Sequence, residues 1–132
     1  MLKIVPNHKK YWNFIRLLRI NSKIQTNFVN SNSNISLEDQ KLYMKKHNDD
    51  YSICFKDNVP VGCIRIKNKD IGLCVDPNYW GLGIGTFMIK EFVKLHPHGF
   101  AQIKLSNKAS IRAFEKAGFK KVYYIMERNV KS

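Results

Sequence analysis

The chain has 132 residues, 44% of them apolar, which is enough for the core of one compact domain spanning residues 1–132. No apolar run reaches the roughly 20 residues that cross a bilayer, and the first residues lack the apolar stretch of about 7–15 residues of a secretory signal, so we expect a cytoplasmic protein without a membrane partner. The formal charge of +13 attracts anions, so nucleic acid, an anionic membrane surface and a polyphosphate cofactor are all candidate partners, and composition does not decide between them.

Two helices are predicted in the N-terminal part of the chain. The first covers roughly residues 8–23, and its dense apolar content indicates burial on more than one side. Small polar residues between positions 30 and 36 predict a loop, because they form hydrogen bonds with their own backbone. The second helix begins after Ser36, where Asp39 completes a pattern close to a capping box, and continues to about His47.

Three strands are predicted next, over residues 51–56, 59–66 and 70–75. The polar connections between them are short, as in hairpins, so we expect an antiparallel meander. The cysteines lie inside these runs at positions 54, 63 and 74, without the paired spacing of zinc ligands, and we expect buried, reduced thiols. We predict no metal site, because His96 and His98 have no third ligand beside them.

The remaining elements alternate between helix and strand. A helix is predicted over residues 85–95, a strand over 101–105, a helix over 108–117 closed by Gly118, and a last strand over 121–126. Together, the pattern predicts an α+β domain with one mostly antiparallel central sheet and helices on both faces.

The segment between the third strand and the next helix carries glycines at alternate positions, Gly81, Gly83 and Gly85. Alternate glycines let the backbone approach a ligand closely, and the start of the following helix adds positive partial charge, which favours a pyrophosphate. The residues around Gly85 match neither a Walker loop nor a dinucleotide fingerprint. A tight turn without a ligand is the alternative interpretation.

A second block, residues 107–119, contains Asn107, Ser110 and Phe114 and ends with Gly118 and Phe119. With both blocks in this order, the chain resembles the GNAT superfamily of acetyl-CoA-dependent N-acetyltransferases over roughly residues 51–126. The resemblance implies that residues 51–126 form the core that binds acetyl-CoA, and that residues 1–50 supply acceptor-side helices.

The resemblance also implies which residues contact acetyl-CoA. Backbone groups of the glycine turn would bind the pyrophosphate, the end of the third strand would pair with the pantetheine arm like an added strand, and Asn107 would hold that arm from the other side. The cofactor-binding residues so implied are Leu73, Cys74, Val75, Trp80, Gly81, Gly83, Ile84, Gly85, Thr86, Asn107, Ser110, Phe114 and Lys116. Trp80 departs from the family, which has Arg or Gln at this position.

Phe114 is a second departure, because many family members carry there a Tyr proposed to protonate the departing thiolate. A thiol has a pKa of about 8.5, so releasing a free thiolate near pH 7 costs only about 2 kcal/mol. Water, Ser110, Tyr123 or Tyr124 could provide the proton. For deprotonation of the amine, the acids are Asp70, Glu38 and Asp39, and the sequence assigns no catalytic residue.

Basic residues recur along the helix predicted over residues 108–117. Lys108, Arg112 and Lys116 are spaced by four residues and share one helix face, which either steers the CoA phosphates or is simply solvated.

The acceptor half resembles members that acetylate amino groups on nucleotide-linked sugars. This resemblance implies that Arg16, Arg19, Phe28 and Tyr51 bind the substrate, with the two arginines facing a diphosphate. The alternatives are a peptide or protein N-acetyltransferase, an aminoglycoside-type enzyme, or a non-catalytic module that binds CoA or nucleic acid. We do not expect nucleic acid, because the chain shows neither an RNA-binding signature nor a zinc finger. We expect a monomer or a homodimer, with the last strand as an exposed edge.

Overall fold

The computed structural model describes residues 1–25 and 35–129. Within them, one antiparallel sheet has the order β1-β2-β3-β4 and consists of β1 Leu2–Pro6, β2 Tyr51–Lys56, β3 Val59–Lys67 and β4 Asp70–Val75. The helices are α1 Trp12–Ile20, α2 Ser22–Gln25, α3 Leu37–His47, α4 Ile84–Leu95 and α5 Lys108–Lys116, with short 3-10 turns at Lys9–Tyr11, Asn48–Asp50 and Pro77–Tyr79. No helix in this part of the chain is long and apolar enough to span a membrane.

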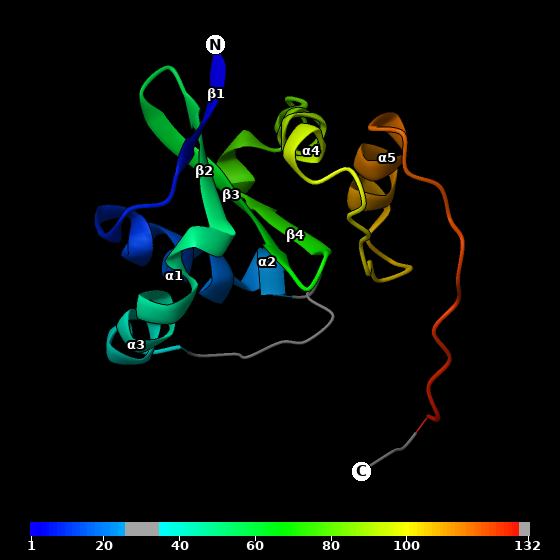
Figure 1. Ribbon diagram of the computed structural model, residues 1–132, viewed down its shortest axis with the longest axis horizontal. Coiled ribbons are helices and arrows are strands. Elements are labelled where there is room, and N and C mark those ends of the chain that lie inside the picture. Colours follow the sequence, from blue (N-terminus) through cyan, green and yellow to red (C-terminus); the bar gives the residue numbers. More distant parts are fainter. Residues whose placement is uncertain (26–34, 130–132) are drawn as a thin grey trace.

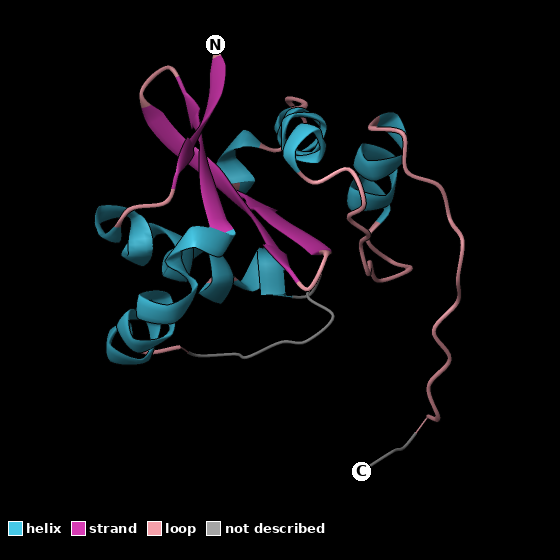
Figure 2. Ribbon diagram, in the orientation of Figure 1, coloured by secondary structure: helices cyan, strands magenta, loops and turns pink. Residues whose placement is uncertain are grey.

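The sheet separates two apolar cores, because neighbouring side chains of a strand point to opposite faces. Ile53 and Cys63 pack on one face with residues of α1, α2 and α3. Cys54 and Ile64 pack on the other face with residues of α4 and α5. Figures 1 and 2 show these helix groups on opposite sides of the sheet, which confirms the expected α+β architecture.

Local sequence signals predicted the meander and α3 correctly. Ser36 caps α3, where its Oγ accepts a hydrogen bond from the backbone N–H of Asp39 at 3.1 Å. Asp57 and Asn58 both have positive φ, as the two central residues of a tight hairpin turn require. Helices α4 and α5 also lie within one residue of their predicted bounds.

The N-terminal predictions need two corrections. The first residues form the edge strand β1, in which Ile4 is paired with Cys54 of β2, whereas no strand was predicted there. The helix predicted over residues 8–23 is divided at Asn21, which has extended backbone angles of φ −64° and ψ 125°. The Asn21 side chain accepts a hydrogen bond from the N–H of Lys23 at 2.9 Å, so it ends α1 and caps α2.

The two strands predicted in the C-terminal third are wrong. Residues 101–105 form no ladder, although Phe100, just before them, makes a single parallel bridge with Asp70. Residues 121–126 form no strand and expose their apolar side chains; Tyr123 is 90% accessible and Tyr124 is 91% accessible. An alternating apolar pattern forms a strand only where a neighbouring strand accepts its hydrogen bonds, and the described residues provide none.

Candidate functional site

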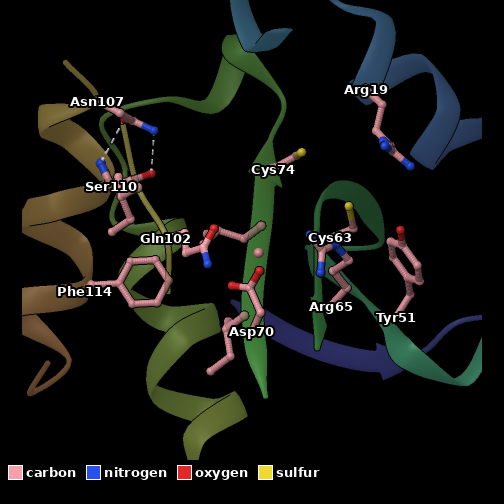
Figure 3. Close-up of a pocket in the computed structure, with 14 residues that line it drawn as sticks. Arg19, Tyr51, Cys63, Arg65, Asp70, Cys74, Gln102, Asn107, Ser110 and Phe114 are labelled. Atoms are coloured by element: carbon pink, nitrogen blue, oxygen red, sulfur yellow. Dashed lines mark hydrogen bonds between the residues drawn. The ribbon is translucent and has the colours of Figure 1, made fainter. Parts of the chain in front are cut away.

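A pocket lies where β4 and the chain after Phe100 separate (Figure 3). Two hydrogen bonds join them at one end: the N–H of Ile71 donates to the carbonyl of Phe100, and the N–H of Phe100 donates to the carbonyl of Lys69, both at 2.8 Å. Beyond this bridge the two segments diverge, and the pocket extends along β4 to Cys74. The sequence predicted a strand where the structure has one side of a cleft.

The backbone of Leu73 lies at the open edge of β4. Residues two apart in a strand direct their N–H and C=O groups to the same side, so Leu73 shares the side of Ile71 and turns away from β3. On that side the carbonyl of Val75 already accepts a hydrogen bond from the indole N–H of Trp80 at 2.8 Å. The N–H and C=O of Leu73 are therefore the backbone pair that β4 offers to an extended ligand.

The glycine turn leads from β4 into α4. Gly81 and Gly83 have φ angles of 82° and 77°, and a Cβ at either position would meet no atom within 4 Å, so backbone conformation rather than space requires glycine. Helix α4 begins at Ile84, and the N–H groups of its first turn have no acceptor within the helix. Because the Ile84 side chain is buried, this position offers a ligand only its backbone.

The block around α5 has a structural explanation. Asn107 caps the helix: its Oδ1 accepts from the N–H of Ser110 at 3.2 Å, and its Nδ2 donates to Ser110 Oγ at 3.0 Å. Gly118, with φ 97°, ends the helix and lets the N–H of Phe119 donate to the carbonyl of Phe114 at 3.0 Å. The rings of Phe114 and Phe119 pack edge to face, so Phe114 forms a buried wall of the pocket.

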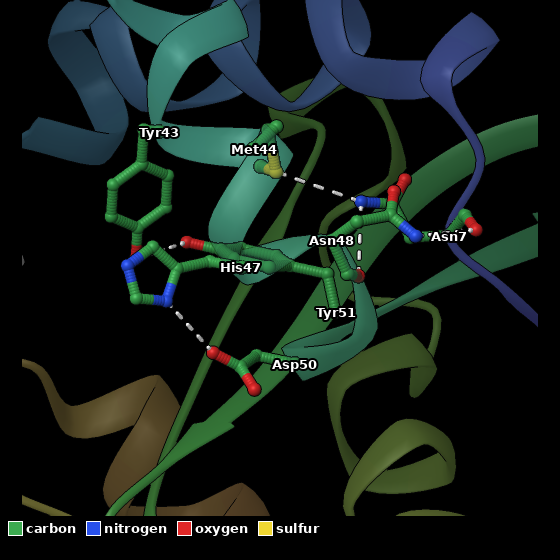
Figure 4. A network of polar contacts seen from close by, with 7 residues as sticks. All are labelled: Asn7, Tyr43, Met44, His47, Asn48, Asp50 and Tyr51. Atoms are coloured by element: carbon green, nitrogen blue, oxygen red, sulfur yellow. Dashed lines mark hydrogen bonds and ion pairs between the residues drawn. The ribbon is translucent and has the colours of Figure 1, made fainter.

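Tyr51 occupies the opposite side of the pocket and is buried in the sheet. Its hydroxyl donates to the hydroxyl of Tyr43 at 3.5 Å, and the Tyr43 ring stacks on His47, whose Nδ1 lies 3.2 Å from Asp50 Oδ2 (Figure 4). Burial and the hydrogen bond with Tyr43 raise the pKa of Tyr51. Tyr51 is therefore a neutral group held in place, and it cannot act as a base near neutral pH.

Asp70 is the carboxylate that lines the pocket. Burial raises its pKa above the ordinary value, while the charge of Arg65 and the N–H of Gln102 act in the opposite direction. Glu38 and Asp39, the other acids considered from the sequence, lie in the exposed first turn of α3 and do not line the pocket. The structure thus reduces the candidate bases to one carboxylate.

The cysteines are free and buried, as expected. Cys63 and Cys74 are opposite one another on β3 and β4 and both line the pocket. Their mutual hydrogen bond, together with burial, raises the pKa of Cys63 well above its usual range. The described residues contain no group of three or more His, Cys, Asp or Glu side chains that could hold a metal ion.

The pocket unites many of the predicted site residues, but not all of them. Leu73, Cys74, Asn107, Ser110, Phe114, Arg19 and Tyr51 line it. Val75, Trp80, Gly81, Gly83, Ile84, Gly85 and Thr86 form the end of β4, the turn and the start of α4, outside that lining. Lys116 is exposed at the end of α5, and Tyr123 and Tyr124 do not line the pocket either.

Of the predicted acceptor residues that the structure describes, Arg16 does not line the pocket. Arg16 donates to Asn13 Oδ1 at 3.1 Å and to the carbonyl of Ile35 at 3.3 Å, and Phe28 lies outside the described residues. Sequence reasoning missed Arg65, Gly72 and Gln102, all of which line the pocket. The available signal for Arg65 was its place two residues after Cys63, on the same face of a predicted strand.

The family model described as "Acetyltransferase (GNAT) family" matches residues 16–119, which is most of the chain. The chain belongs to the GNAT acetyltransferase family. It is therefore an acetyl-CoA-dependent N-acetyltransferase, and acetyl-CoA is its co-substrate.

Solved structures share the fold of this chain at low sequence identity. Spermidine N-acetyltransferase from Vibrio cholerae, in complex with CoA and spermine, superimposes with a TM-score of 0.83 at 14% identity, covering 99% of this chain and 88% of that one. A GNAT family acetyltransferase from Bacillus anthracis gives 0.75 at 18% identity, covering 93% and 82%. A domain from Methanocaldococcus jannaschii gives 0.76 at 20% identity, covering 92% and 90%. No curated protein sequence matches the chain.

Proposed function

We propose that this GNAT enzyme transfers the acetyl group directly to the primary amine of a small substrate, without an acyl-enzyme intermediate. The carrying observation is the open edge of β4, with α5 residues on one side and Tyr51 and Arg19 on the other (Figure 3). An acetyl group held at this edge would lie between the two sides. The thiols of Cys63 and Cys74 are buried and hydrogen-bonded to each other, and this favours direct attack by the amine over an acyl-enzyme.

The acetyl-CoA contacts follow from the donor groups of the cleft. The N–H groups at the start of α4 suit the pyrophosphate, because they are unpaired within the helix and carry its positive partial charge. The backbone of Leu73 suits the amides of the pantetheine arm, which would add to β4 as a strand does. The family's Arg or Gln at the position of Trp80 would contact the cofactor directly. Trp80 would act indirectly, because its hydrogen bond to the carbonyl of Val75 fixes the turn against β4.

We assign proton removal from the amine to Asp70. A primary amine with a pKa of about 10 arrives as an ammonium and must lose a proton before it can attack. The carboxylate of Asp70 lines the pocket, and its raised pKa makes it a better proton acceptor than an ordinary Asp.

For the departing thiolate, Ser110 is the hydroxyl group that α5 contributes to the pocket. Because its oxygen accepts the hydrogen bond from Asn107, its own proton remains available for the sulfur. This contact compensates for the absence of a Tyr at Phe114. The exposed Tyr123 and Tyr124 are not needed in this mechanism.

The acceptor that we favour is an amino group on a nucleotide-linked sugar. Arg19 and Tyr51 line the pocket and support this choice, whereas Arg16 donates hydrogen bonds to Asn13 and Ile35 and does not line the pocket.

The test combines binding with turnover. Calorimetry with acetyl-CoA, followed by a thiol-release assay over a panel of amines that includes nucleotide-linked amino sugars, peptides and aminoglycosides, should give binding and amine-dependent release. Initial rates should depend on both substrates as in a ternary-complex mechanism. Ping-pong kinetics would contradict direct attack, and acetyl-CoA binding without release for any amine would leave a non-catalytic CoA-binding module.

A further inference from the structure

Arg65 reaches the pocket by lying across Gly72. The two residues are partners in the β3–β4 register, and a Cβ at Gly72 would lie 3.3 Å from Arg65 Nη2 and 3.4 Å from Cζ. Gly72 is not one of the glycines with positive φ, so its backbone does not require glycine. The missing side chain instead makes room for the guanidinium of Arg65 over the edge strand.

A second guanidinium lines the same pocket. Arg19 approaches from α1, on the side of the sheet that carries Tyr51 and Cys63 (Figure 3). The hydrogen bond with Cys63 lowers the pKa of Cys74, and the charges of Arg19 and Arg65 act in the same direction. Both guanidinium groups line the pocket that Cys74 also lines.

Asp70 does not form an ion pair with Arg65. Among the described residues, Arg65 forms no ion pair within 4.0 Å, with Asp70 or with any other acid. The other polar groups nearby, Tyr51 and Gln102, are neutral. The pocket lining thus contains a guanidinium group, Arg65, and a carboxylate, Asp70, that form no ion pair with each other, an arrangement that suits a ligand with one ammonium and at least one negative charge.

We propose that Arg65, positioned by Gly72 and assisted by Arg19, forms an anion-binding subsite, and that the acceptor is an amine carrying a phosphate or carboxylate group. This inference rests on the proposed function, because it takes the Arg19 side of β4 as the acceptor side. The ammonium is directed to Asp70 and the anionic group to the guanidinium groups. A polyamine such as the spermine bound by the Vibrio cholerae structure would instead bring further positive charge to these arginines.

The experiment compares matched probes that differ only in the anionic group. The protein saturated with CoA is titrated calorimetrically with phosphoethanolamine against ethanolamine, and with β-alanine against propylamine; spermidine is the polycationic probe. We expect the anionic member of at least one pair to bind about tenfold tighter or more, since charge-assisted hydrogen bonds carry the difference. The phosphate and carboxylate pairs identify which anion the subsite takes.

Substitutions connect the preference to Arg65. Arg65→Gln should remove most of the preference for the anionic probe and leave the affinity for acetyl-CoA unchanged. Arg65→Lys should retain part of the preference for the anionic probe. Gly72→Ala keeps the charge of Arg65 but displaces its guanidinium, so it should lower the affinity for the anionic probe and leave the affinity for its partner without the anionic group unchanged. Lys67→Gln is the control, because it removes one charge from an exposed position on the same strand outside the pocket.

The outcomes separate the two proposals. Equal affinity for the members of both pairs, including no affinity for any of them, overturns the anionic subsite, as does a preference that survives in Arg65→Gln. Acetyl transfer is measured separately: if no amine of any charge is acetylated, the proposed function fails while the binding result stands. Melting temperatures of the variants verify that each is folded.

Discussion

Replacement of Asp70 by Asn tests the proposed chemistry most directly. With Asp70 ionised, the enzyme can bind the ammonium and remove its proton, so kcat/KM varies little with pH above the raised pKa of this carboxyl. Asp70→Asn has no such acceptor and must use the fraction of amine that is already neutral. For an amine with a pKa of about 10, this fraction is about one thousandth at pH 7 and about one tenth at pH 9.

We therefore expect kcat/KM of Asp70→Asn to be about a thousandfold lower than that of the wild type at pH 7 and only about tenfold lower at pH 9. The assay is thiol release at subsaturating amine and saturating acetyl-CoA, measured between pH 6 and 9. Glu38→Gln, on the exposed first turn of α3, is the control and should behave as the wild type. A loss of less than tenfold at pH 7, or one that does not shrink as the pH rises, would refute Asp70 as the base.

Four further predictions follow from the same contacts. Asp70→Asn should raise the melting temperature at pH 7, because a carboxyl whose folded pKa is raised destabilises the fold once ionised; in calorimetric scans the gain should vanish below pH 3.8, where Asp70 is protonated in both states. Arg112→Ala on the basic face of α5 should raise the KM for acetyl-CoA more at low than at high salt, whereas Lys41→Ala on α3 should not; a salt-independent change removes phosphate steering. Cys74→Ser should retain kcat within about tenfold, because direct attack needs no thiol, and a larger loss in a folded variant would indicate an acyl-enzyme. Phe114→Ala should lower the unfolding free energy by about 3–5 kcal/mol in denaturant titrations, since it empties a buried ring position against Phe119.

The sequence predicted those features that depend on neighbouring residues. The cap of α3 by Ser36, the hairpin at Asp57 and Asn58, and the glycine turn all follow from local backbone chemistry. The glycine turn, together with the block at residues 107–119, was also sufficient to suggest the family, which the family model confirms. Such features need no knowledge of which strands become neighbours.

The missed features depend on contacts between distant residues. β1 is a strand because Leu2–Pro6 pairs with β2, which lies about fifty residues later in the sequence. Arg65 belongs to the site because Gly72 on the adjacent strand leaves room for its side chain. The same reasoning explains the error at residues 101–105, whose pattern suits a strand but whose backbone leaves β4 after Phe100. Pairing and divergence of strands are decided by the whole fold, so no local pattern reports them.

The open edge of β4 is where the proposed function places the cofactor. An edge strand leaves N–H and C=O groups without partners, and a cleft shields them from part of the water that would otherwise satisfy them. Trp80 satisfies one of them through the carbonyl of Val75, and the bridge to Phe100 satisfies the N–H of Ile71. The groups of Leu73 lie between these two fixed points, so a ligand with amide groups at strand spacing completes the edge without any rearrangement of the sheet.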